Sequence, residues 1–182
     1  MGKQIEADIF LLRLIHNNRI ELFDSTLLWI SKTAYLIAIG IIFCLGWFVF
    51  FKKSENAKDI FLKLLLMLST ATLIVISLKY AIHRTRPFDL YGDIVNLSIA
   101  NSPSFPSGHT VIAFILSFGL LFSNLKRLYY LPVLVWALLV AYSRLALGIH
   151  FPTDVIISII IAFVVTIIFK NFTITKWKQK VL

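Results

Sequence analysis

The 182-residue sequence contains a single cysteine, Cys44, which lies inside an apolar run. One thiol can form neither an intrachain disulfide framework nor a thiolate metal cluster, so both are excluded as supports of the fold. Polar low-complexity sequence is almost absent, which argues against a disordered chain. The N-terminus carries acidic residues early and lacks a small-residue cleavage site, so we expect no cleavable signal peptide.

Acidic residues are also scarce, with nine Asp and Glu against eighteen Lys and Arg and a formal net charge of +9. This excess of positive charge could suggest a nucleic-acid ligand. Most of the basic residues flank apolar runs, where they meet anionic lipid headgroups and set the topology, so we expect no nucleic-acid partner. With 59% hydrophobic residues and a mean hydropathy of +0.86, the sequence is typical of a membrane protein.

Five apolar runs are separated by polar or charged segments. A transmembrane helix needs about 20 residues, and lysines that flank a shorter run can extend their charged ends to the membrane surface. The sequence therefore predicts one domain over residues 1–182, all-α and integral to the membrane, built as a bundle of about five transmembrane helices. The runs are Thr33–Phe51, Leu64–Leu78 (extending to about Ile82), Ser107–Phe122, Leu128–Ser143 and Val155–Phe169.

Residues 1–24 differ from these runs because ionisable side chains interrupt the apolar ones. This pattern favours an amphipathic helix in the membrane interface over a sixth span. Asp24–Thr26 offers N-cap residues for the first span. Residues 88–106 form the one long polar connection, and we expect an extracytoplasmic loop with a functional role. The interrupting residues are Glu6, Asp8, Arg13 and His16.

Five spans place successive loops on alternate faces of the membrane. One face holds the short basic segments 52–59, 124–127 and 170–180, and it is expected to be cytoplasmic because Lys and Arg dominate there. The opposite face holds the N-terminal segment, the 88–106 loop and the turn around residues 148–152. We therefore expect a cytoplasmic (inner) membrane protein with this second face toward the periplasm or the exterior.

Ionisable residues in or beside membrane spans are functional candidates, because burying a charge in lipid is costly. They gather in three segments, KYAIHRTRP at 79–87, PSGH at 106–109 and SRLALGIHFPTD at 143–154. The alternation of loops, which follows from run boundaries and charge alone, places all three segments at the periplasmic or extracellular face. The sequence predicts a single site there.

Lys79, Arg86 and Arg144 form a cluster of cations with few carboxylates near them in the sequence. Such a cluster favours an anionic ligand, and arginine binds phosphate oxygens in a bidentate manner. Ser107 offers a hydroxyl, and the backbone at Gly108 opens a helix whose free N–H groups also favour an anion. These residue types predict a phosphate-binding site.

Two histidines, His109 and His150, accompany this site, so that one can act as a nucleophile while the other donates a proton. Asp154 follows His150 by four residues, and Pro152 favours the first turn of a helix there. An aspartate in that position can orient an imidazole and stabilise its cation. No H-x3-H pair or carboxylate cluster indicates a metal, and we predict no metal or other cofactor. The chemistry predicted is phosphoryl transfer.

The motifs K-x6-R-P, P-S-G-H and S-R-x5-H-x3-D, in this order between Lys79 and Asp154, resemble the full signature of the type 2 phosphatidic acid phosphatase superfamily. The resemblance implies metal-independent dephosphorylation through a phosphohistidine. It implies that His150 is the nucleophile, Asp154 its partner, and His109 the acid that protonates the leaving oxygen. It also implies that the phosphoryl oxygens are held by Lys79, Arg86, Arg144, Ser107 and the backbone of Gly108.

Three other ionisable residues are assigned outside the site. His83 is interpreted as a packing or interfacial residue and Arg84 as a solvated charge, although either could touch a headgroup. His16 is interpreted as an interfacial surface residue.

Two functional classes follow. The leading one is a membrane phosphatase that acts among membrane lipids on a lipid phosphate or diphosphate, above all a bacterial envelope lipid such as undecaprenyl diphosphate or lipid A 1-phosphate. Phosphatidylglycerophosphate and phosphatidate are alternative substrates. The other class is a non-catalytic lipid-phosphate binder or flippase, which has no need of two histidines and an aspartate at these spacings. Vanadate-dependent haloperoxidases have a similar anion pocket but are soluble, and the apolar composition argues against them.

Overall fold

The computed structural model describes residues 2–98, 100–122 and 130–171. Every regular element in these residues is a helix, which confirms the predicted all-α class. The basic segments 124–127 and 172–180, on which the orientation partly rested, lie outside the described residues. The elements are α1 (Gly2–Asn17), the 3-10 helix η1 (Glu21–Phe23), α2 (Asp24–Phe50), α3 (Glu55–Ile82), α4 (Pro87–Leu90), α5 (Gly108–Leu121), α6 (Tyr130–Ala146) and α7 (Pro152–Phe169).

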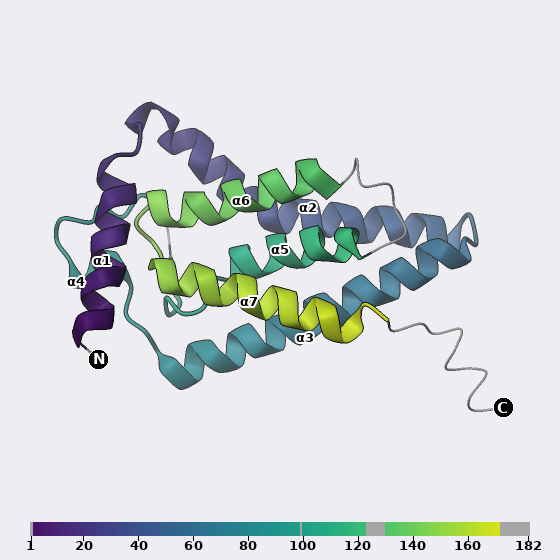
Figure 1. The fold of residues 1–182 in the computed structure, drawn as a ribbon. Helices are drawn as coiled ribbons and strands as arrows, with labels where there is room; N and C mark the ends of the chain where they lie inside the picture. Colours follow the sequence, from purple (N-terminus) through teal and green to yellow (C-terminus); the bar gives the residue numbers. More distant parts are fainter. Residues whose placement is uncertain (1, 99, 123–129, 172–182) are drawn as a thin grey trace.

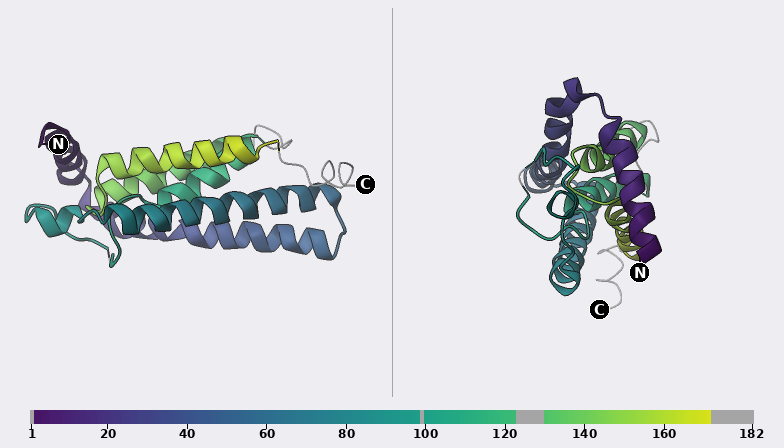
Figure 2. Two further views of the ribbon diagram at one scale, coloured as in Figure 1. Left: turned by 90° about the horizontal axis from the view of Figure 1, so that it is seen from below. Right: turned by 90° about the vertical axis from the view of Figure 1, so that its left-hand side faces the viewer.

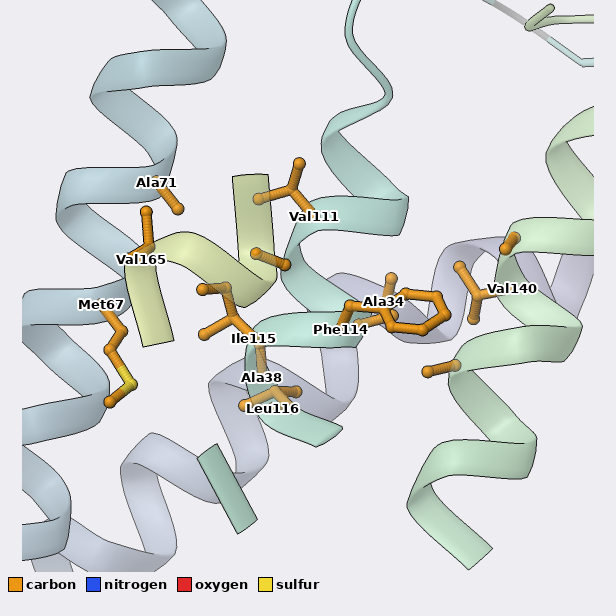
Figure 3. Close-up of a cluster of buried hydrophobic side chains, with 14 of the residues drawn as sticks. Ala34, Ala38, Met67, Ala71, Val111, Phe114, Ile115, Leu116, Val140 and Val165 are labelled. Carbon is orange, nitrogen blue, oxygen red and sulfur yellow. The ribbon is translucent and has the colours of Figure 1, made fainter. Parts of the chain in front are cut away.

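Five helices, α2, α3, α5, α6 and α7, run alongside one another as a bundle, with α5 in the middle (Figure 1). α5 contacts each of the other four. Small side chains of α2, Ala34 and Ala38, lie beside Phe114 and Ile115 of α5 in the buried core, and Ala71 of α3 lies beside Val165 of α7 (Figure 3). Small residues let neighbouring helices approach closely in a membrane protein. The core is therefore built around α5.

Three of the bundle helices are long and apolar enough to cross a membrane: α2 with 27 residues, α3 with 28 and α7 with 18. The other two are apolar but shorter, with 14 residues in α5 and 17 in α6. At 1.5 Å per residue, α5 is only about 21 Å long, less than the thickness of a hydrocarbon core. Because four helices surround it, its ends need not reach the lipid headgroups.

The long helices α2 and α3 begin earlier than the apolar runs predicted. α2 begins at Asp24, within the segment that was expected to cap it and well before the apolar run at Thr33, and α3 begins at Glu55 instead of Leu64. An apolar run marks only the part of a helix that suits lipid, whereas polar and charged residues continue the same helix beyond it.

The start of α2 corrects a second prediction. Asp24–Thr26 was expected to supply the N-cap, but η1 leads directly into α2 and the N-cap position is Phe23, which makes no side-chain cap. The Asp24 carboxylate instead accepts a hydrogen bond from Arg19, with Nε and Oδ1 3.1 Å apart. Asp24 therefore closes the turn between α1 and α2.

α1 crosses one end of the bundle instead of running beside the other helices (Figure 2). It packs against α6 and α7. Ile9 and Leu12 are buried in this contact, while Phe10 and Leu14 are exposed. A separate N-terminal helix is thus present within residues 1–24, and its place in the membrane interface stays a prediction.

His16, near the end of α1, is 1% exposed, so its assignment as an interfacial surface residue is wrong. Its Nδ1 lies 2.8 Å from the carbonyl oxygen of Ala146 in α6, and its Nε2 accepts a hydrogen bond from the Val95 N–H at 3.2 Å. These partners define a neutral ring that donates through Nδ1 and accepts through Nε2. Burial lowers the pKa of His16; the Ala146 carbonyl partly opposes this shift, and the nearby Arg19 reinforces it.

We expect the thermal stability of the detergent-solubilised protein to fall as the pH drops from about 7 to about 5. His16 has a lower pKa in the folded protein than in the unfolded chain, so the unfolded chain binds the extra proton. The stabilising contribution is present above a pH of about 6.5 and is lost below it, by at most about 1.4 kcal/mol per pH unit. Thermal scans of wild type and His16→Gln should show a flatter pH dependence in the variant. Identical slopes would contradict this role of His16.

Candidate active site

The three motif segments meet at one end of the bundle, where α3 and α6 end and α5 and α7 begin (Figure 1). A cavity of about 590 Å³ lies there. The structure brings six of the eight predicted site residues together on its wall, while Ser107 and Asp154 lie outside the lining. The six are Lys79, Arg86, Gly108, His109, Arg144 and His150.

The end of α3 carries two of the cations to the cavity. His83 follows α3 in the left-handed conformation (φ 48°) and is exposed, so the chain turns back over the end of the bundle. Lys79, in the last turn of α3, donates a hydrogen bond from Nζ to the Pro103 carbonyl. Arg86, after the turn, donates from Nε to the Ser102 carbonyl and from Nη1 to the Ile149 carbonyl, both at 2.7 Å.

Arg144, in the last turn of α6, is the third cation and is 4% exposed. Its Nη1 donates to the Ser31 hydroxyl of α2, and its Nε has no hydrogen-bond partner among the described residues. Among the described residues, none of the three cations forms a salt bridge with a carboxylate. Positive charge without a carboxylate partner therefore faces the cavity, an arrangement that favours an anion with several oxygens.

The PSGH segment places Gly108 and His109 on the cavity wall, whereas Ser107 is not part of the lining. Ser107 is fully buried at the N-cap of α5. Its hydroxyl accepts a hydrogen bond from Thr110 at 2.9 Å, and its N–H donates to the Ser158 hydroxyl of α7 at 2.8 Å. Ser107 thus anchors the start of α5 to α7, and the structure does not place it with the predicted phosphate ligands.

The turn between α6 and α7 delivers His150 to the cavity. Gly148 in this turn has a φ of +71°, a conformation that side chains other than glycine rarely adopt. A Cβ there would lie 2.8 Å from both Ile94 Cγ2 and the Val95 carbonyl oxygen, so the 88–106 loop packs directly on the glycine. Pro152 occupies the first turn of α7, as predicted.

Asp154 lies fully buried behind His150. His150 Nδ1 and Asp154 Oδ2 are 3.5 Å apart, and Nδ1 makes no hydrogen bond within the described residues. Oδ2 accepts hydrogen bonds from the Phe151 N–H at 2.9 Å and from the Ser104 hydroxyl. Burial lowers the pKa of His150, so its ring is neutral near pH 7. With Nδ1 beside the carboxylate, Nε2 is the ring nitrogen left for a substrate.

Arg84 is the site neighbour that the sequence reasoning missed. It was predicted to be a solvated charge, but its guanidinium forms salt bridges with Asp154 at 2.5 Å and with Asp8 of α1 at 2.6 Å. The signal in the sequence is that Asp8 stands four residues before the apolar Leu12, on the same face of a helix, and a face that carries Leu12 is expected to be buried. That spacing indicates burial of Asp8 without naming its partner.

α2 adds a second neighbour of the site, which lies outside all three motif segments. Tyr35 lines the cavity, and its ring packs edge-on against His109 with the centroids 4.6 Å apart. The apolar part of the wall comes from α3 and α5 and includes Val75, Ile76 and Ile112. The cavity therefore joins a cationic part to an apolar part, which suits an amphiphile with an anionic head.

We expect Gly148→Ala to destabilise the protein by more than about 1 kcal/mol, because the new Cβ is strained at positive φ and meets the 88–106 loop. Gly92→Ala is the matched control, since a Cβ at Gly92 would have nothing within 4 Å. Thermal scans in detergent should show a lower Tm for the first variant and an unchanged Tm for the second. Equal Tm values for both variants would contradict this account of the turn.

Comparison with known proteins extends the similarity beyond the motifs. The family model of the PAP2 superfamily matches residues 60–178. Undecaprenyl-diphosphatase BcrC of Bacillus subtilis is 28% identical over 88% of this chain and 79% of its own length. Phosphatidylglycerophosphatase B of the same organism is 33% identical over 83% of this chain and 75% of its own.

A solved structure matches in the same way. The crystal structure of Aquifex aeolicus LpxE superposes with a TM-score of 0.78 at 30% identity, covering 91% of this chain and 96% of that one. Sequence and fold thus agree over nearly the whole molecule. Since the family model spans more than half of the chain, this protein belongs to the PAP2 superfamily and is an enzyme of the lipid phosphatase class.

Proposed function

We propose that the protein removes a phosphoryl group from a membrane lipid phosphate or diphosphate through a phosphohistidine on His150. The observation that carries the proposal is the composition of the cavity wall, where three cations and two histidines adjoin apolar side chains. An amphiphile can present its phosphate to the cations while its chains stay beside the apolar helices. A soluble phosphate ester would gain nothing from the apolar part.

In the first step, the neutral His150 attacks phosphorus through Nε2. The P–N bond forms as the bond from phosphorus to the lipid oxygen breaks, and His109, which is protonated once the phosphate anion lies beside it, gives its proton to that oxygen. Asp154 stabilises the positive charge that develops on the imidazole of His150. Lys79, Arg86, Arg144 and the Gly108 N–H are the groups that hold the phosphoryl oxygens and stabilise the charge in the transition state.

In the second step, water attacks phosphorus and the P–N bond breaks. His109, now neutral, takes the proton of the water, and His150 leaves as the neutral ring. The products are inorganic phosphate and the dephosphorylated lipid, so the enzyme returns to its starting state. Among the described residues, no group of His, Cys, Asp and Glu side chains could hold a metal ion, and neither step requires one.

Undecaprenyl diphosphate and phosphatidylglycerophosphate are the substrates that the names of the two Bacillus subtilis relatives supply. We favour an envelope lipid such as undecaprenyl diphosphate or lipid A 1-phosphate, with phosphatidylglycerophosphate and phosphatidate as alternatives. All of them offer the cations the same phosphate oxygens. Selection among them rests on the apolar wall and on the 88–106 loop.

We also infer that the cavity faces the periplasm or the exterior. The basic segment 52–59, which comprises the link from α2 and the first residues of α3, lies at the opposite end of the bundle from the cavity. Short basic loops are retained on the cytoplasmic side of a membrane. A cavity at the other end then meets lipids of the outer leaflet.

Purified protein in detergent with EDTA should release phosphate from at least one of undecaprenyl diphosphate, lipid A, phosphatidylglycerophosphate and phosphatidate. His150→Ala should abolish release, and Asp154→Asn should reduce kcat by up to about 10⁴-fold, because an unoriented histidine is a poor nucleophile. With substrate labelled in its terminal phosphate, acid-labile and base-stable label should appear on the wild-type protein and be absent from His150→Ala.

Each contrary result has a definite meaning. Label that persists in His150→Ala would place the covalent intermediate on another residue. A wild-type protein that binds these lipids but releases no phosphate from any of them would instead support the non-catalytic binder. Loss of release in EDTA that returns with added metal would overturn the metal-independent mechanism.

A further inference from the structure

Arg84 connects the N-terminal helix to the buried aspartate behind His150. Its Nη1 donates to Asp154 Oδ1 at 2.5 Å, and its Nη2 donates to Asp8 Oδ2 at 2.6 Å. The guanidinium also lies over the ring of Phe151, 3.9 Å from the centroid. We propose that Arg84, braced by Asp8, is a positioning residue that fixes the Asp154 carboxylate against His150; this inference rests on the proposed role of His150 as nucleophile.

The two oxygens of Asp154 have separate partners. Oδ1 is bound by Arg84, while Oδ2 faces His150 and accepts from the Phe151 N–H and the Ser104 hydroxyl. Rotation of the carboxylate about its Cβ–Cγ bond, out of its present plane, would break all three hydrogen bonds and turn the oxygen that faces His150 away from the imidazole. The charged bond to Arg84 is the strongest of the three, because both of its partners are ionised. Arg84 therefore holds Oδ2 toward the imidazole.

Asp8 keeps the guanidinium in place from the other side. Its carboxylate is 3% exposed, and Oδ1 accepts a hydrogen bond from the Thr153 N–H at 2.9 Å. Oδ2 accepts from the Thr153 hydroxyl at 2.5 Å as well as from Arg84. Thr153 is in the first turn of α7, whose N–H groups lack intrahelical partners. Asp8 thus fixes the start of α7 and the guanidinium together, so α1 supports the site as well as covering it.

Arg84 does not line the cavity of about 590 Å³, so it is not placed to touch the substrate phosphate. It lines a second, neighbouring cavity of about 690 Å³, together with His83 and Asp89. Its side chain keeps 23% of its surface exposed. A small cation in solution can therefore reach the position of the guanidinium when the side chain is removed.

The test compares wild type with Arg84→Ala, Arg84→Lys and Asp8→Asn. We expect Arg84→Ala to lower kcat by about 10- to 100-fold with KM unchanged, because the nucleophile loses its alignment while the phosphate ligands remain. Added guanidinium chloride, at concentrations too low to unfold the protein, should restore part of the lost kcat in Arg84→Ala. The same additive should leave the kcat of wild type and of Arg84→Lys unchanged. Asp8→Asn should show a smaller fall in kcat, again with KM unchanged.

Arg13→Gln is the matched control. Arg13 also joins α1 to another segment through an aspartate, with Nε and Asp93 Oδ2 2.6 Å apart. This pair is exposed, and neither of its residues is among the hydrogen-bond partners of Asp154. The kcat of Arg13→Gln should equal that of wild type. Tm values measured for every variant separate loss of alignment from loss of folding, and Asp8→Asn and Arg84→Lys carry the test if Arg84→Ala does not fold.

The inference is overturned if folded Arg84→Ala keeps the wild-type kcat, if its defect lies in KM alone, or if guanidinium rescues nothing. A loss of kcat in Arg13→Gln equal to that in Asp8→Asn would also overturn it. Loss of any contact between α1 and the rest of the protein would then be enough to lower kcat. A different result would contradict the proposed function, namely phosphate release that persists in the His150→Ala variant.

Discussion

The buried carboxylate of Asp154 determines how the chain is arranged at the end of the bundle that holds the cavity. A charge at the end of an apolar bundle is stable only when donors surround it, because water is no longer available to solvate it. Asp154 receives its donors from three separate parts of the chain: Arg84 after α3, Ser104 before α5 and the Phe151 N–H before α7. Each of these parts also carries a motif. The hydrogen bonds that Asp154 accepts therefore bring the predicted phosphate ligands and both histidines together.

The short central helix explains why this chemistry is recessed into the bundle. α5 is enclosed by four helices and begins at Gly108, so the chain leading into it enters the bundle before the helix starts. Around that entry the cations bind carbonyl and hydroxyl oxygens, which position them without neutralising them. An arriving phosphate then meets charges whose geometry is already fixed, and preorganisation of this kind is the main electrostatic contribution to catalysis.

Local patterns were enough to predict the helices and the convergence of the motifs, because hydrophobic runs and short spacings are properties of neighbouring residues. Pro152 at the start of α7 and Asp154 one turn beyond His150 are of this kind. The partners of Arg84 and His16 were not predictable, since Asp8 and Ala146 lie 76 and 130 residues away from them in the chain. The anchoring of the Ser107 N–H to the Ser158 hydroxyl, 51 residues later, is likewise not revealed by the motif that contains Ser107.

The N-terminal helix shows how such long-range contacts change the meaning of a pattern. Asp8, Leu12 and His16 are spaced four residues apart, so they form one stripe along α1, and all three are buried. Asp8 binds Thr153 at the start of α7, and His16 binds the Ala146 carbonyl at the end of α6. The turn that carries His150 runs between these two points. The ionisable residues that interrupt the apolar sequence are thus not all a polar face for lipid headgroups: two of them hold both ends of the turn on which the proposed nucleophile sits.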